Sequence, residues 1–208
     1  MYYAFEKTLT DYKIESEEED LMTIYRPINI QCWNELEEGK ITQDELRYLR
    51  IDRFLKAINA KVNSTDFADS YHANLSDKIF WMKDAQTLIP KWAKSFKLAL
   101  VTNGFKEIQR ARLTKMNMDE YFHHIIISDE IGSSKPHQPF FDYTFSKIGK
   151  VDKNRVLIIG DSLGSDIQGG SDYGIHTCWL NPSEKELPEH LTPTFTIKEL
   201  EDLDVILK

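Results

Sequence analysis

The 208-residue sequence predicts an α/β fold, in which a Rossmann-like parallel sheet with helices on both faces follows an N-terminal helical module. Two observations lead to this prediction. Before about residue 82, apolar and charged residues alternate at helical spacing, and after residue 85 short apolar runs alternate with helical stretches. We therefore expect two parts, residues 1–84 and residues 85–208.

The first part is predicted to be helical throughout, because Gly39 and Pro27 are the only glycine and proline in its first 82 residues. Gly39 is expected to close one helix, and Thr42 to open the next in a capping box with Glu45. These two signals bracket a helical hairpin. The acidic run at residues 15–20 is interpreted as a solvated helix start, since carboxylates suit the positive end of a helix dipole.

The second part alternates predicted strands with predicted helices. The apolar runs are residues 98–101, 125–127, 156–159 and 177–180, each short enough for a strand that is buried on both faces. Strands that alternate with helices imply a parallel sheet with right-handed crossovers. Gly149 and Gly174 are expected to end helices, Pro139 to begin one, and residues 181–193 to form a surface loop.

Composition narrows the class of partner. A formal charge of −8 and a pI near 5.3 argue against nucleic-acid or anionic-membrane binding, so we expect a small-molecule partner. Cys32 and Cys178 lie far apart and form no CxxC pair, so neither a disulfide framework nor a zinc site is indicated. The sequence has no apolar run of about 20 residues and no signal-peptide pattern, and we therefore expect a cytoplasmic protein.

Polar residues collect where the predicted strands end, which is where open parallel sheets bind ligands. Thr102, Asn103 and Gly104 follow the first strand and precede a helix whose free N–H groups could receive a phosphate. Lys135 lies after the second strand in a loop held by Pro136, where a fixed ammonium is a natural phosphate partner. These residues predict a phosphate-binding edge.

Two carboxylates complete this edge after the third strand. Asp161 and Asp166 would place hard oxygen ligands where Mg²⁺ could bind. Each signal has a plainer alternative when it is considered alone: residues 102–104 could be an ordinary turn, Asp161 a helix cap and Lys135 a surface charge. Their order along successive strand–helix units favours the functional interpretation.

This order resembles motifs two to four of the haloacid dehalogenase-like superfamily: a strand-end Thr, a Lys-Pro loop, then Gly-Asp with a further Asp. Residues 32–42 (CWNELEEGKIT) and residues 178–181 (CWLN) look like the non-canonical pyrimidine 5′-nucleotidase branch. The resemblance implies a Rossmann-like core and a helical cap over the substrate. It also implies one Mg²⁺ and hydrolysis of a small phosphorylated metabolite, a nucleoside 5′-monophosphate, through an aspartyl-phosphate.

The same resemblance implies a role for each residue of the edge. Thr102 would hydrogen-bond the transferring phosphoryl group, and Lys135 would neutralise it and orient the nucleophile. Asp161 would bind the metal, and Asp166 would support the metal's water shell and Lys135. The Gly160-Asp161 pair favours a phosphatase over the dehalogenases of the superfamily, which use no metal.

The superfamily's first motif, an Asp-x-Asp pair at the end of the first strand, is expected to be absent. None of the aspartates before the first predicted strand follows an apolar run. In the superfamily the missing strand lies between those at residues 98–101 and 156–159, so its loss would open two unpaired edges. We therefore expect a core without its first strand and an incomplete N-terminus, or else a catalytically inactive phosphate- or partner-binding module.

Other possibilities have less support. The run from Gly160 to Gly164 does not complete the GxGxxG motif of a dinucleotide-binding domain, and the histidines have no acid or nucleophile at a telling spacing. Substrate specificity would come from the cap, for which Tyr25, Trp33 and Phe80 are candidate contacts, although aromatic residues at helical spacing are more often core.

Overall fold

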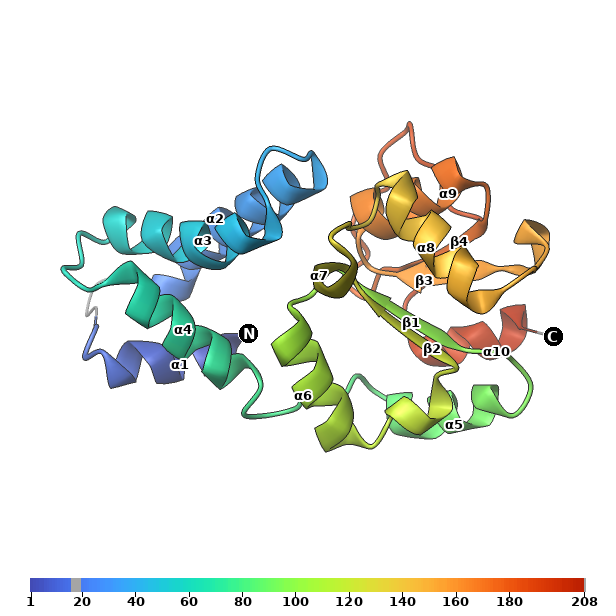
Figure 1. Cartoon of the computed structure of the whole chain (residues 1–208), viewed down its shortest axis with the longest axis horizontal. Coiled ribbons are helices and arrows are strands. Elements are labelled where there is room, and N and C mark those ends of the chain that lie inside the picture. Colours follow the sequence, from blue (N-terminus) through green and yellow to red (C-terminus); the bar gives the residue numbers. More distant parts are fainter. Residues whose placement is uncertain (16–19, 208) are drawn as a thin grey trace. The chain divides into compact units, whose positions relative to one another are not determined.

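A computed structural model describes residues 1–15 and 20–207 of the chain, which divides into two compact units (Figure 1). Unit 1 comprises residues 1–79 and 107–115, and unit 2 comprises residues 80–106 and 116–208. The predicted fold class, a parallel α/β core with a helical module, is confirmed.

Unit 1 is made of helices. They are α1 (Tyr2–Asp11), α2 (Leu21–Glu37), α3 (Gln43–Ala57), α4 (Ser64–Leu75) and most of α6 (Lys106–Met116). The predicted capping box is present, because the Thr42 hydroxyl accepts from the Glu45 N–H and the Glu45 carboxylate accepts from the Thr42 N–H. Gly39 follows α2 with a φ of +70°, as expected of a helix-ending glycine. Of the acidic run, Asp20 caps α2, while residues 16–19 lie outside the described residues.

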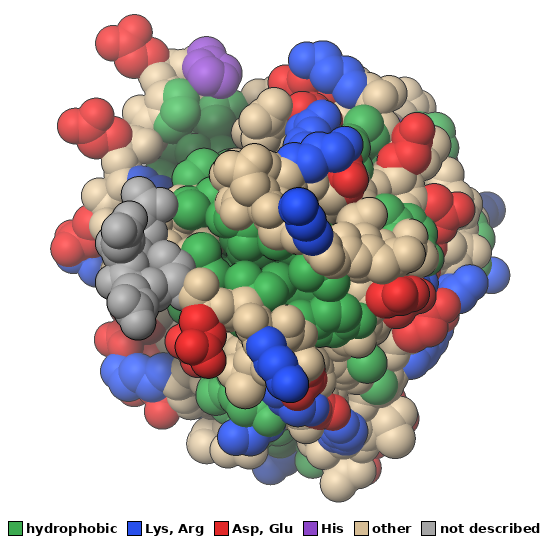
Figure 2. All heavy atoms as spheres, turned by 90° about the vertical axis from the view of Figure 1, so that its left-hand side faces the viewer, with side chains coloured by type: hydrophobic (Ala, Val, Ile, Leu, Met, Phe, Trp, Pro, Cys, Tyr) green, Lys and Arg blue, Asp and Glu red, His purple; other side chains and the backbone are tan. Residues whose placement is uncertain are grey.

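The core of unit 1 is an aromatic cluster without solvent contact. Its rings belong to Phe5, Tyr25, Phe54, Phe67 and Tyr71, each 0% exposed. Phe5 stacks on Tyr25 with ring centroids 4.4 Å apart, and the edges of Phe54 and Tyr71 pack against the pair. Figure 2 shows acidic and basic side chains interspersed on the face that it presents.

Unit 2 contains all the strands of the described residues. They are β1 (Ala99–Thr102), β2 (His124–Ile127), β3 (Leu157–Gly160), β4 (His176–Leu180) and β5 (Phe195–Ile197). The four predicted strands are present within one residue of their expected bounds, and every pairing is parallel. The sequence did not predict β5, because three residues after a loop give too short an apolar pattern to detect.

These strands form two separate sheets. One contains β1 and β2, and the other has the order β3-β4-β5. No ladder joins β1 to β3 among residues 1–15 and 20–207. The strands of unit 2 are therefore interrupted between β1 and β3. Each of these two strands runs parallel to the strand with which it pairs.

Helices and short turns cover both faces of the strands of unit 2, with α8 and α9 on one side and α5 and α10 on the other (Figure 1). They are α5 (Ala85–Ala93), η1 (Asp119–Tyr121), α7 (Ser128–Ile131), α8 (Gln138–Ile148), η2 (Lys153–Arg155), η3 (Leu163–Gln168), α9 (Gly169–Tyr173), η4 (Leu200–Asp202) and α10 (Leu203–Ile206). Gly149 and Gly174 end α8 and α9, and Pro139 lies in the first turn of α8, as predicted. None of the helices in the described ranges is long and apolar enough to cross a bilayer.

Candidate active site

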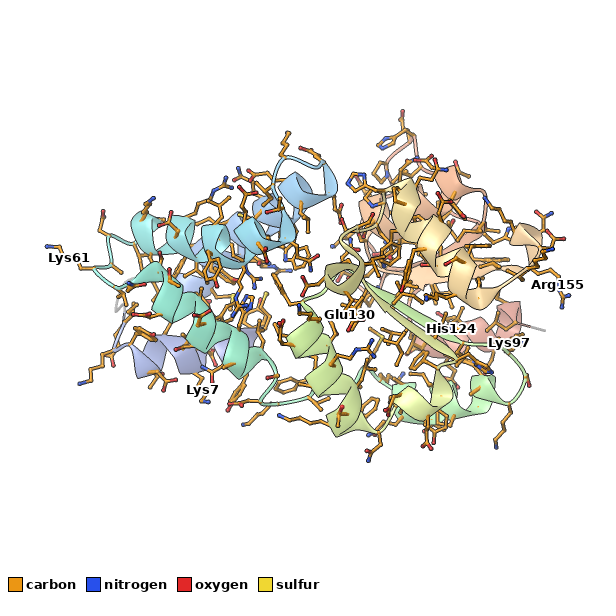
Figure 3. All side chains as sticks on the ribbon, in the orientation of Figure 1. Lys7, Lys61, Lys97, His124, Glu130 and Arg155 are labelled. Atoms are coloured by element: carbon orange, nitrogen blue, oxygen red, sulfur yellow. The ribbon has the colours of Figure 1, made fainter. Side chains whose placement is uncertain are left out.

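The candidate site lies at the carboxyl ends of β1 and β3 in unit 2. Figure 3 helps to orient this edge, because Lys97 and His124 mark the amino ends of β1 and β2, whereas Glu130 follows the carboxyl end of β2. In a parallel sheet, residues that follow successive strands come to the same edge. The sequence motifs after β1, β2 and β3 are brought together in this way.

Lys135 is the centre of the site. Its Nζ donates to Oδ1 of Asp166 at 2.5 Å and to the main-chain oxygen of Val101 at 3.3 Å. Both charged side chains are only 8% exposed. A buried ammonium stays charged when it is paired and hydrogen-bonded, so the lysine is a positive charge fixed between the end of β1 and the segment after β3.

Asn103 holds the loop that carries this lysine. Its Nδ2 donates to the main-chain oxygen of Lys135 at 2.7 Å, and its Oδ1 accepts from the Lys135 N–H at 2.8 Å. Because the nitrogen and the oxygen of its side-chain amide both bond the main chain of Lys135, Asn103 positions the lysine. The phosphate contact that the sequence suggested for Asn103 stays a prediction.

Thr102 ends β1 beside this loop. Its Oγ1 accepts from the Gly104 N–H at 3.2 Å, and the Lys106 N–H at the start of α6 donates to Asp129 Oδ2 at 3.0 Å. An accepting hydroxyl retains its own proton for donation. Thr102 can therefore still donate to a ligand, whereas the N–H groups of Gly104 and Lys106 have partners inside the protein.

Asp166 is held from two sides. Oδ1 accepts from Lys135 Nζ, and Oδ2 accepts from the Ser162 N–H at 3.1 Å. A Cβ added at Gly160 would lie 2.0 Å from Asp166 Oδ2, so only glycine allows the carboxylate to approach the end of β3 this closely. Asp166 consequently supports the lysine through one oxygen and the main chain after β3 through the other.

Asp161 is the exposed carboxylate of the edge. It directly follows β3, and its main-chain oxygen accepts from Trp179 Nε1 at 3.3 Å. Among the described residues there is no group of three or more His, Cys, Asp or Glu side chains that could hold a metal ion. One carboxylate fits Mg²⁺, which commonly uses one or two protein carboxylates and completes its shell with water and phosphate oxygens.

The three candidate specificity residues have different environments. Tyr25 and Trp33 are in α2 of unit 1, where Tyr25 is 0% exposed within the aromatic core and Trp33 is half-buried. Phe80 belongs to unit 2 and is 70% exposed. The Tyr25 ring thus packs in the protein interior, and Phe80 has the most accessible surface of the three.

The chain does contain one Asp-x-Asp pair, Asp202-Leu203-Asp204, so the prediction that the sequence lacks any such pair is wrong. It lies in η4 and α10 rather than after a strand. Asp202 accepts from the main-chain N–H groups at the start of η4, and Asp204 Oδ1 accepts from Trp92 Nε1 at 2.9 Å. Both carboxylates are used in local structure, so this pair does not have the strand-end position of a nucleophile motif.

Two positioning groups were missed at the sequence level. Ser162 donates its N–H to Asp166 and its hydroxyl caps η3, and Trp179 bonds the main chain of Asp161. Ser162 directly follows Asp161 and Trp179 lies in the CWLN run, so both were in motifs already noted. Their roles depend on contacts 4 and 18 residues apart that the motifs do not specify.

Comparison with known proteins places this geometry in a family. The family model described as haloacid dehalogenase-like hydrolase matches residues 1–180. This chain belongs to that family. Pyrimidine 5′-nucleotidase YjjG of Escherichia coli is 30% identical over 206 residues, which is 99% of this chain and 90% of that protein. Pyrimidine 5′-nucleotidase PynA of Streptococcus pneumoniae is 31% identical over 86% of this chain and 76% of that protein.

A solved structure agrees with this assignment. The HAD-hydrolase YfnB of Bacillus subtilis, solved bound to magnesium, matches all of this chain and 90% of that chain, with a TM-score of 0.93 and 33% identity. The L-2-haloacid dehalogenase of Xanthobacter autotrophicus has a TM-score of 0.76 at 16% identity, which shows the fold alone. The chain is therefore a hydrolase by family, with relatives named as nucleotidases.

Proposed function

We propose that this protein is a Mg²⁺-dependent phosphomonoesterase that acts on a small phosphate ester, a nucleoside 5′-monophosphate. The observation that carries the proposal is the Lys135–Asp166 pair, buried at the strand edge beside the Thr102 hydroxyl. Relatives named pyrimidine 5′-nucleotidase support the substrate class.

The residues of the edge suit phosphoryl transfer. Catalysis of this reaction consists mainly of positioning and of opposing the charge on the phosphoryl oxygens. Lys135 offers a fixed positive charge, and Thr102 offers a hydroxyl donor. Asp166 and Asn103 keep the lysine in place through its side chain and its main chain, respectively.

Asp161 is the residue that would hold magnesium, because it is exposed and directly follows the carboxyl end of β3. When bound, the ion would supply further positive charge to phosphate oxygens. Asp166 would act on this part of the site indirectly, because both of its oxygens already accept hydrogen bonds.

A covalent aspartyl-phosphate route requires a carboxylate that attacks phosphorus from beside Lys135. The described residues offer no strand-end aspartate of this kind before β1, and Asp202 and Asp204 are in local hydrogen bonds. The nucleophile of such a route is therefore not among the described residues before β1.

The test is hydrolysis by the protein purified from its complete gene, with UMP, dTMP, AMP and p-nitrophenyl phosphate, in Mg²⁺ and in EDTA. We expect turnover that needs Mg²⁺, and a loss of about 10²-fold in kcat for Thr102→Val. Thr114→Val, on the exposed surface of α6, is the matched control and should keep full activity. Folded protein that binds Mg²⁺ but hydrolyses no member of the panel would contradict the proposal.

A non-catalytic phosphate-binding module is the second candidate, and the lack of a strand-end nucleophile among the described residues favours it. In this case the 208-residue chain would bind inorganic phosphate through Thr102 and Lys135 without turnover. Calorimetric titration with phosphate, together with the same assay, distinguishes the two functions.

A further inference from the structure

The two carboxylates of the strand edge are held in different ways. Asp166 uses both of its oxygens, on Lys135 Nζ and on the Ser162 N–H. Among residues 1–15 and 20–207, the Asp161 side chain forms no hydrogen bond and no ion pair. An exposed side chain without contacts keeps its rotamer freedom, so fixing it on a ligand costs conformational entropy. The position of the Asp161 carboxylate is therefore set by the main chain that carries it.

One side chain bonds this main chain. Trp179 Nε1 donates to the Asp161 main-chain oxygen at 3.3 Å, across 18 residues of sequence. Trp179 is only 3% exposed, and it lies in β4 in register with Gly160, the residue before Asp161. An indole has a single donor and no acceptor, so this bond uses its whole hydrogen-bonding capacity. Trp179 thus places a fixed donor where the chain leaves β3.

The alternation of β4 explains the direction of the indole. Successive side chains of a strand point to opposite faces. Cys178 and Leu180 pack against α5 and α10, so Trp179 between them points to the other face. Gly160 is its partner in register, and a Cβ added there would meet Asp166. The indole therefore lies on the same face of the sheet as the carboxylate that pairs with the catalytic-edge lysine.

A second buried indole in unit 2 provides a comparison. Trp92 is 8% exposed, and its Nε1 donates to Asp204 Oδ1 at 2.9 Å. This bond joins α5 to α10, away from the carboxyl ends of the strands. The two tryptophans share burial and donor, but only Trp179 bonds a residue of the candidate site. A role in stability is common to both, whereas a role in ligand binding is specific to Trp179.

We propose that Trp179 is a positioning residue for magnesium: its indole N–H holds the main chain of Asp161 so that the exposed carboxylate meets the ion in one place. The inference rests on the proposed function only in taking Asp161 as the magnesium ligand, and it names the residue that sets the affinity of that ligand. Groups that orient a metal ligand from outside the coordination sphere typically change metal affinity by roughly 10–100-fold when they are removed.

The test is calorimetric titration of Mg²⁺ into the protein purified from its complete gene. Trp179→Phe keeps an aromatic ring and removes the indole N–H, so the Kd for Mg²⁺ should rise at least tenfold. Trp92→Phe is the matched control, because it removes the same donor from another buried indole of unit 2. It should lower Tm and leave the Kd for Mg²⁺ within twofold of the wild-type value.

A closer replacement separates the hydrogen bond from packing. Benzothienylalanine keeps the bicyclic shape of tryptophan and has sulfur in place of the N–H group. Incorporated at Trp179, it should raise the Kd for Mg²⁺ as much as Trp179→Phe does, with Tm near that of the wild type. This variant keeps the test decisive if Trp179→Phe folds poorly.

Two further measurements distinguish positioning from a general loss of structure. Without Mg²⁺, inorganic phosphate should bind Trp179→Phe and the wild type equally, because Thr102 and Lys135 are unchanged. Raising Mg²⁺ above the new Kd should restore kcat with p-nitrophenyl phosphate, because the variant alters the occupancy of the metal site rather than the phosphate contacts.

Equal Mg²⁺ affinity of the wild type and Trp179→Phe would overturn the inference, and so would an equal loss of affinity in Trp92→Phe. Full affinity with benzothienylalanine would also overturn it, because packing would then be the cause. Mg²⁺ binding that depends on Trp179, without hydrolysis of any phosphate ester, would support the inference and contradict the proposed function. Mg²⁺-dependent turnover with an unchanged Kd in Trp179→Phe would do the reverse.

Discussion

Unit 1 and unit 2 bury their apolar residues to different degrees. Unit 1 closes its aromatic core completely, with Phe5, Tyr25 and Phe54 at 0% exposure. In unit 2, β1 and β3 have apolar residues that remain partly exposed beside a cavity of about 380 Å³. The difference shows that helices can satisfy their own main chain, whereas a sheet strand depends on neighbours at both edges.

The largest expected effect compares a buried residue of unit 1 with a partly exposed strand residue of unit 2. Phe54→Ala should destabilise unit 1 by about 3–5 kcal/mol, because it leaves a cavity in a closed core. Ile159→Ala should cost less than about 1 kcal/mol, since Ile159 is already 38% exposed. Urea unfolding, followed by hydrogen exchange in α3 and β4, measures each unit separately. Equal losses for the two variants would show that the cores are equally packed.

Acid should destabilise unit 1 through His72. Burial, with Arg50 and Arg47 as further causes, lowers the pKa of His72 from 6.5 to about 3, and its Nε2 lies 2.8 Å from Arg50 Nη2. Between pH 6.5 and pH 3, His72 is therefore protonated in the unfolded chain and neutral in the folded chain. The contribution of His72 to the free energy of unfolding is fully present above pH 6.5. Below pH 6.5 it falls by about 1.4 kcal/mol per pH unit, or about 3 kcal/mol by pH 4.

Replacement of this histidine tests the assignment. His72→Gln should flatten the pH dependence of unfolding in this window, because glutamine can still accept from Arg50 but does not titrate there. His190→Gln, at an exposed position of unit 2, is the control and should leave the slope unchanged. If the pH dependence of unfolding is unchanged in His72→Gln, other groups cause the acid sensitivity.

In unit 2, Gly160→Ala should cost about 1–3 kcal/mol, because the new Cβ would lie 2.0 Å from Asp166 Oδ2. The carboxylate must then move away from Lys135 and Ser162. In an Asp166→Gly background, which also removes the Asp166 Cβ that would lie 2.7 Å away, the same substitution should cost much less, and a double-mutant cycle from urea unfolding measures this coupling. Additive losses would indicate that the two residues do not interact.

The smallest expected effect concerns the start of α3. Thr42→Ala removes the acceptor of the capping box and should cost about 1 kcal/mol of unit 1 stability. Thr42→Ser, which keeps a hydroxyl, should restore most of it. Thermal unfolding of the three proteins gives the order, and a Thr42→Ser variant no better than Thr42→Ala would exclude the cap as the cause.

Local signals were predicted well from the sequence because they depend on neighbouring residues. The capping box at Thr42, the helix end at Gly149 and four strand positions needed only spacing and residue type. Tyr25 shows the limit, because helical spacing does not tell which face of α2 meets the core. Its ring is packed against Phe5 and Phe54.

The sequence by itself determined the order of the motifs, and with it the family and the strand edge at which Thr102, Lys135 and Asp161 follow successive strands. The resemblance implied that Asp166 supports Lys135, but only the tertiary structure shows the contact itself, since the two residues are 31 apart and meet through the arrangement of the strands. It also decided that β1 and β3 belong to two separate sheets among the described residues. The physical reason is that pairing across a sheet depends on which strands lie side by side, and local residue patterns do not encode this.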